Sequence, residues 1–287
     1  MRTSPVVLDR VTRLTPLGIR FWDRVTNRIV ADGLAVDVYP KDEPERRVTA
    51  RANAIGTFVL PRLPGARDVA IDGRAGDATF WQTVRSRPYV IDVTDCYGRF
   101  QPFTIEQPLP ARGLAMPPCL PPASPPIEAV PIFSTPARAV PDGMTVVRAE
   151  LMALPPGHSE PVPASWAVLD VHVAGQAPAR GIADRQGRVA VIVPYPELAA
   201  RPMRAASPPN ASTQPLWEQE WTVRLATFYD GMAPPPLTPD LCRTLAQRAA
   251  PLWSDVQASR PLPTQVFRYG EELIVRNAFI TTVGSPP

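Results

Sequence analysis

Alternation of apolar with polar or small residues is the dominant pattern of the chain, and it predicts β-strands. The pattern occurs in "LAVDVYP" (Leu34–Pro40) and "WAVLDVHV" (Trp166–Val173), and again after Gly56 and after Gly187. Successive side chains of a strand point to opposite faces of the sheet, so a period of two is what a half-buried strand requires. We therefore predict a mainly all-β chain.

These stretches belong to a repeated unit with the order strand, short loop, strand, Asx-x-x-Gly turn and strand. The side chain of Asn53 or Asp184 can accept a hydrogen bond from the backbone two residues on. Gly56 or Gly187 can adopt a positive φ without a Cβ clash, which lets the chain reverse. The sequence predicts structural turns at these four residues and two β-sandwich domains related by duplication.

Further strands extend both domains. They are predicted at Leu17–Val25, Tyr89–Asp95 and Arg99–Gln107 in the first domain, and at Gly143–Leu154, Pro215–Tyr229 and Thr264–Gly284 in the second. The "DCYG" sequence, Asp95–Gly98, lies between two of these strands and predicts a hairpin. The last predicted segment contains a turn at Gly270.

One helix is predicted near the C-terminus, over Thr238–Val256. Thr238 is the expected N-cap and Pro239 the first helical residue, where its missing N–H costs nothing. Asp240 then lies in the first turn, where the helix dipole favours a carboxylate. Pro251 ends or kinks this helix.

Proline is the most unusual feature of the composition. The chain has 39 prolines, and since proline lacks an N–H, long uninterrupted helices cannot be its main architecture. The segment between the two domains is proline-rich, which predicts a semi-rigid, extended connector. Within it, Val130, Ile132 and Phe133 suggest a strand or an arm that packs on one domain. The predicted order is an N-terminal arm (1–15), a sandwich (16–107), a Pro-rich linker (108–142) and a sandwich that contains the helix (143–287).

Charge and cysteine content exclude several classes of protein. The net charge is +3 and the arginines are dispersed among acids, so the one-sided basic surface of a nucleic-acid-binding protein is not expected. No apolar run has the length of a signal peptide or a membrane span. Cys96, Cys119 and Cys242 form no even set and no CxxC pair, which predicts free thiols. We expect synthesis and retention in the cytoplasm, unless the chain leaves the cell in a larger particle.

No set of residues indicates catalysis. The two histidines, His158 and His172, lie in a loop-like sequence and in a predicted strand. HExxH, GxSxG and phosphate-binding GxxxxGK[ST] patterns are missing from the sequence. We therefore expect no catalytic residue, no cofactor and no metal, and an enzyme with an unrecognised site is the weakest hypothesis.

Trp217 and Trp221, in "WEQEW", are the candidate binding aromatics. With Gln219 they share one face of the predicted strand, as aromatic platforms for sugars do, but the same spacing places tryptophans in a sandwich core. The spacing favours the core and leaves both interpretations open.

The repeated unit resembles the carboxypeptidase regulatory-like or transthyretin-like β-sandwich, a likeness that implies fold more than function. A narrower likeness is carried by "VVRAEL", "WAVLDV", "ARGIADRQGRVAVIVPYPE" and "PLWEQEWTVRL", in that order. It is similar to a group of uncharacterised proteins encoded in bacterial contractile injection system, or phage-tail-like, clusters. This resemblance implies a non-enzymatic structural adaptor, with sheath, tube, terminator or baseplate proteins, or a second copy of the chain, as partners.

Assembly also suits the pattern of the sequence. Sandwiches have open edge strands, and an extended arm can add to a neighbour's sheet through main-chain hydrogen bonds. The segment before Leu17 and the C-terminal "TTVGSPP" are candidate arms. The alternative function is a carbohydrate- or cell-surface-binding module that uses Trp217 and Trp221.

Overall fold

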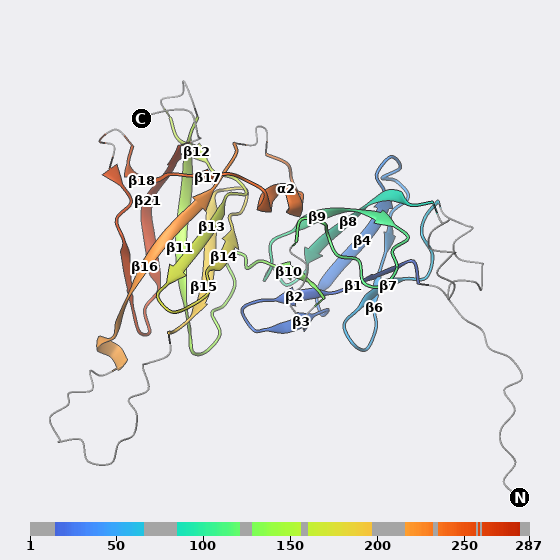
Figure 1. The fold of residues 1–287 in the computed structure, drawn as a ribbon, viewed down its shortest axis with the longest axis horizontal. Coiled ribbons are helices and arrows are strands. Elements are labelled where there is room, and N and C mark those ends of the chain that lie inside the picture. The colour runs from blue at the N-terminus through green and yellow to red at the C-terminus, as the bar shows by residue number, and fades with distance from the viewer. Residues whose placement is uncertain are drawn as a thin grey trace, which may run out of the picture. The chain divides into compact units, whose positions relative to one another are not determined.

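The protein is described from a computed structural model that covers residues 15–65, 85–120, 128–155, 160–196, 216–231, 235–256, 258 and 260–281. These residues form mainly β-strands and one short α-helix, which confirms the predicted all-β fold class (Figure 1). The chain divides into two compact units, each with its own buried residues. Unit 1 comprises residues 1–22, 28–96 and 103–131, and unit 2 comprises residues 23–27, 97–102 and 132–287.

Three sheets are formed by strands that lie mostly in unit 1. The first contains β1 (Leu17–Ile19), β7 (Phe58–Leu60) and β6 (Arg51–Ala52); the second contains β10 (Val130–Ile132), β2 (Phe21–Asp23) and β3 (Arg28–Val30); the third contains β5 (Val48–Thr49), β4 (Leu34–Pro40), β8 (Arg87–Asp95) and β9 (Phe103–Leu109). Phe21 lies at the centre of the core, with its ring 5.5 Å from Phe58 and 6.2 Å from Phe103.

Unit 2 is a sandwich of two larger sheets. One contains β12 (Val162–Pro163), β11 (Met144–Leu154), β15 (Arg188–Pro194), β21 (Leu273–Thr281), β18 (Leu252–Asp255) and β19 (Arg260–Pro261). The other contains β14 (Ala179–Ile182), β13 (Val168–Val173), β16 (Glu220–Phe228), β17 (Ala249–Ala250) and β20 (Gln265–Arg268). Leu151 and Val191 of the first sheet and Leu169 and Val223 of the second lie in one apolar core.

The repeat predicted from the sequence recurs in the strand pairing. In unit 1, β1 pairs with β7 and β4 with β8, all antiparallel. In unit 2, β11 pairs with β15 and β13 with β16 in the same way. The second unit adds β21, which runs parallel to β11.

Several predicted elements are confirmed. The hairpin around Asp95–Gly98 is formed by β8 and β9, with Val93 opposite Phe103. The strand predicted around Val130 and Ile132 is β10, within the proline-rich segment. Gly270 has a φ of +78° between β20 and β21, although these two strands belong to different sheets.

The predicted helix over Thr238–Val256 is wrong in both of its bounds. The helix α2 spans Leu241–Leu245, and its N-cap is Asp240, whose side chain accepts the backbone N–H of Arg243. Ala249–Ala250 is instead strand β17, paired with β16, and β18 follows. Leu241, Leu245 and Ala249 recur at helical spacing in the sequence, but ladder hydrogen bonds to β16 and the burial of Ala250 outweigh that local preference.

The long strand predicted over Pro215–Tyr229 is also shorter than expected. It begins at Glu220, and Leu216–Glu218 forms a 3-10 turn, η2. The predicted insert at 198–214 and His158 lie outside the described residues. No helix in the described ranges is long and apolar enough to cross a membrane.

Candidate interaction site on the second unit

The two Asx-Gly turns have the same hydrogen bonds. Asn53 Oδ1 accepts the backbone N–H groups two and four residues later, at 3.1 and 3.0 Å. Asp184 Oδ1 accepts the equivalent groups at 2.8 and 2.9 Å. Gly56 and Gly187 have φ values of +76° and +78°. In each turn, Oδ1 of the Asx residue therefore stabilises the hairpin by accepting two backbone N–H groups.

The structure places the two candidate tryptophans on different elements. Trp217 lies in η2 and is 72% exposed. Trp221 lies in β16 and packs against the core, with its ring 5.3 Å from Phe267 and 5.5 Å from Tyr195. Because the chain turns between them, Trp217 and Trp221 do not share one face of a strand.

The other reactive residue types do not converge in the described part of the chain. Described His, Cys, Asp and Glu side chains form no group of three or more that could hold a metal ion. His172 is half-buried in β13, opposite Arg224 of β16. Cys96 is free and exposed, whereas neither Cys119 nor Cys242 is a free thiol, because each is in a disulfide; the expectation of free thiols is wrong for these two residues.

One buried ion pair lies within unit 2. Arg138 donates to both oxygens of Asp23, at 3.0 and 2.6 Å, and its guanidinium lies 4.7 Å from the centre of the Phe100 ring. Burial raises the pKa of the Asp23 carboxyl, but the hydrogen bonds from Arg138 and Thr26 and the Arg138 charge outweigh it, so the pKa lies below the usual value of an aspartate. This pair was not predicted, since its two members are far apart in the sequence.

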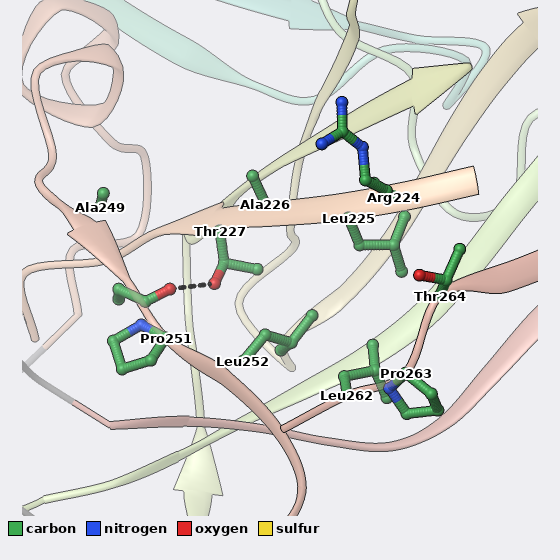
Figure 2. Close-up of a pocket in the computed structure, with 11 residues that line it drawn as sticks. Arg224, Leu225, Ala226, Thr227, Ala249, Pro251, Leu252, Leu262, Pro263 and Thr264 are labelled. Atoms are coloured by element: carbon green, nitrogen blue, oxygen red, sulfur yellow. Dashed lines mark hydrogen bonds between the residues drawn. The ribbon is translucent and has the colours of Figure 1, made fainter. Parts of the chain in front are cut away.

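A cavity of about 500 Å³ opens at the edge of β16 (Figure 2). One wall is Arg224–Thr227 of β16, and the others are the segments 249–252 and 262–264, which cross between the two sheets. Figure 2 shows Leu225 on the side of β16 that faces Leu252 and Leu262, and Arg224 on the opposite side. Among the described residues that line this cavity, Arg224 is the only charged one.

The cavity lies where β16 changes its partner. On this edge Glu220–Val223 pairs with β20, and Thr227–Phe228 pairs with β17. Arg224–Ala226 has no ladder partner on this edge among the described residues, although all three residues pair with β13 on the other edge.

The backbone of Leu225 points into this gap. Alternate residues of an antiparallel strand direct their N–H and C=O groups to the same edge. Tyr229 N–H donates to Arg248 O at 2.9 Å, and Gln219 O accepts Tyr269 N–H at 3.3 Å, so the odd-numbered residues of β16 face the edge with β17 and β20. Leu225 therefore presents a donor and an acceptor above a cavity that is lined by both apolar side chains and polar groups.

This site was not predicted from the sequence. Its only sequence signal is the pair Pro251 and Pro263, which lie where the chain leaves and re-enters the sheet of β16. Proline cannot donate to a ladder, so a proline in a predicted strand region marks a point where pairing stops. Spacing alone does not reveal that both prolines border the same three residues of β16.

The comparisons with known proteins add little. No model of a protein family matches the chain, and no curated protein matches it either. Similar solved structures include the TIE protein of Bacillus anthracis (9% identity, TM-score 0.26), the minor pilin GBS52 of Streptococcus agalactiae (6%, 0.25) and the shaft pilin SpaA of Lactobacillus rhamnosus GG (9%, 0.21). These matches cover 93%, 94% and 96% of this chain, and 34%, 98% and 100% of the other chains. The chain therefore spans about a third of the TIE protein.

Proposed function

We propose that the chain is a non-enzymatic structural or adaptor subunit of a phage-tail-like contractile injection particle, near its sheath, tube, terminator or baseplate. The observation that carries the proposal is that extended segments complete the sheets of this protein. β10, from the proline-rich segment, joins the sheet of β2 and β3. Ala111 N–H and Ala115 N–H donate to Pro16 O and Gly18 O along β1, at 3.0 and 2.7 Å.

An extended segment that pairs with a sheet edge can form contacts between subunits as well as within one chain. An extended segment gains main-chain hydrogen bonds from a sheet edge whichever chain it comes from. The gap beside Leu225 offers an edge of this kind in unit 2. The resemblance in sequence to proteins of contractile injection system clusters supports a location in such a particle. We also propose that the two units are tandem carboxypeptidase regulatory-like domains.

The test is recovery of the chain from intact particles. Contractile particles are purified from the native host by two successive centrifugation gradients that separate particles by different physical properties. Their subunits are then quantified by mass spectrometry. The expected result is a fixed ratio of this chain to sheath or tube protein in every fraction. A protein that remains in the soluble fraction at full yield, with none in the particles, contradicts the proposal. The same experiment tests whether a chain made in the cytoplasm leaves the cell within a particle.

The exposure of Trp217 favours carbohydrate or cell-surface binding as the second candidate. An exposed indole can stack on a sugar ring, whereas Trp221 is committed to the core. The informative variant is Trp217→Ala, because Trp221→Ala is expected to destabilise the fold by about 3–5 kcal/mol. Binding on a glycan array that Trp217→Ala abolishes would favour this candidate, and a blank array would remove it.

A further inference from the structure

The gap along the edge of β16, at Arg224–Ala226, has three features that together indicate the chemical class of its ligand. Leu225 presents a backbone donor and acceptor that have no ladder partner on this edge among the described residues. The cavity beneath is lined by the apolar side chains of Leu225, Leu252 and Leu262 together with polar groups, and Arg224 is the charged residue among its described lining residues. An extended peptide with an apolar residue next to a carboxylate satisfies all three.

The opening sets the length of that peptide. The paired residues on either side are Val223 and Thr227, so the gap is four residue steps, or roughly 14 Å at about 3.4 Å per residue. A segment of about three residues fits between the two ladders. The cavity of about 500 Å³ lies within the range of protein pockets for small ligands, about 300–1,000 Å³, and therefore has room for a leucine side chain.

We propose that this gap docks the N-terminal segment of a second copy of the chain, "SPVVLDR" (Ser4–Arg10), and this inference rests on the proposed structural function. The segment is an apolar run that ends in an aspartate. In an antiparallel register, Leu8 lies opposite Leu225 and Asp9 opposite Arg224. Residues directly opposite one another share a face of the sheet, so Leu8 enters the cavity and Asp9 meets the arginine.

The neighbouring residues agree with this register. Val7 lies opposite Ala226, whose small side chain leaves room for it. Val6 and Pro5 would fall opposite Thr227 and Phe228, where β17 already occupies the edge, so only Val7–Asp9 pairs and the segment leaves the sheet at Val6. Pro5 therefore loses no ladder bond and directs the segment away from the sheet.

The occupant belongs to a second copy because structural subunits repeat. A segment of one copy that docks on a different surface of the next is a heterologous contact, and such contacts generate rings or filaments. One site is expected to be weak, because only a short segment is paired. Many such sites along an assembly act together.

The experiment uses the full chain and measures self-association by sedimentation velocity over a concentration series. We expect concentration-dependent oligomers that an added peptide of residues 1–14 reduces to monomers. Leu8→Asp and Arg224→Glu are each expected to weaken association about tenfold or more. The double variant Asp9→Arg/Arg224→Glu is expected to restore it, because the ion pair returns with reversed charges. Arg276→Glu, which changes an exposed arginine of β21, is the matched control and leaves association unchanged.

Circular dichroism first establishes that each variant is folded. A chain that stays monomeric at every concentration overturns the inference. Equal effects of Arg224→Glu and Arg276→Glu, or a charge-reversed pair that fails to restore association, overturn it as well. Particle purification separates the two proposals: Arg224→Glu that enters particles at the normal ratio refutes this docking site and leaves the proposed function intact. A chain that self-associates through this gap but is missing from particles contradicts the proposed function alone.

Discussion

Gly187 occupies a position where two backbones approach closely. A Cβ placed there would lie 2.3 Å from Leu151 O, and the φ of +78° is itself unfavourable for other residues. Leu151 N–H donates to Gly187 O at 2.8 Å, which keeps the two segments together. At Gly56 the nearest contact of a Cβ would be 2.9 Å, but to the side chain of Ile29, which can move. A side chain at Gly187 therefore clashes with backbone, whereas one at Gly56 meets only a movable side chain.

We expect Gly187→Ala to lower the free energy of unfolding by more than about 3 kcal/mol, because it adds a backbone clash to about 1–2 kcal/mol of φ strain. Gly175→Ala is the matched control: its φ is also +78°, and a Cβ there has nothing within 4 Å. The difference between the two variants in urea denaturation isolates the clash with Leu151. Equal losses would mean that the hairpin can shift away from β11.

The Asp23–Arg138 pair makes unit 2 sensitive to acid. Because the pKa of Asp23 in the folded protein lies below its unfolded value, its contribution is complete above the usual aspartate range, about pH 4, and is lost as pH falls through the folded pKa. We expect Asp23→Asn to flatten this part of the stability profile between pH 5 and pH 2, measured by denaturation at each pH. At pH 7, Arg138→Met is expected to cost about 3–5 kcal/mol, since it leaves a buried carboxylate unpaired. An unchanged acid slope in Asp23→Asn would contradict this account.

At the scale of elements, helix α2 depends on one cap. Asp240 Oδ1 accepts Arg243 N–H at 2.7 Å, and Asp240 O accepts the hydroxyl of Thr244 at 2.8 Å. We expect Asp240→Ala to lower the free energy of unfolding by about 1 kcal/mol. Thr238→Ala, which changes the residue that the sequence favours as the cap, is expected to have an effect below about 0.5 kcal/mol. Thermal unfolding of the two variants side by side checks this order, and the reverse order would support the cap at Thr238.

The edge of β16 is expected to differ in protection along its length. Val223 and Thr227 face the same edge as Leu225 but belong to the ladders with β20 and β17. In dilute solution the amide of Leu225 should therefore exchange with deuterium faster than the amides of Val223 and Thr227, by about tenfold or more. Exchange measured by NMR at single residues tests this. Equal protection at the three amides would show that the gap is closed in solution.

At the scale of the whole molecule, each unit has its own buried core. Ile91 is fully buried in unit 1, and Leu169 is fully buried in unit 2. Ile91→Ala and Leu169→Ala are each expected to cost about 2–5 kcal/mol. We expect calorimetry to show two transitions, with each variant lowering a different one. A single transition that both variants lower equally would mean that the units unfold together.

The sequence predicted the local features well. The strand at Leu34–Pro40 has its predicted bounds, and the paired turns follow from residue types within four positions of each other. The predicted helix is wrong in its bounds because Ala249 fits the helical spacing of Leu241 and Leu245, yet Ala249 pairs with β16. The interaction site could not be predicted, because the gap beside Leu225 depends on where the chain crosses between the two sheets. These crossings lie at Pro251 and Pro263, far from Leu225 in the sequence.

The sequence by itself determined the period of the strands and the places where the chain reverses, because both depend on the backbone preferences of neighbouring residues. Only the tertiary structure decided which strands pair, which tryptophan is buried, which charges meet in the interior and where an edge is left open. These outcomes arise from contacts between residues far apart in the chain, whose gain in burial and hydrogen bonding outweighs local preference.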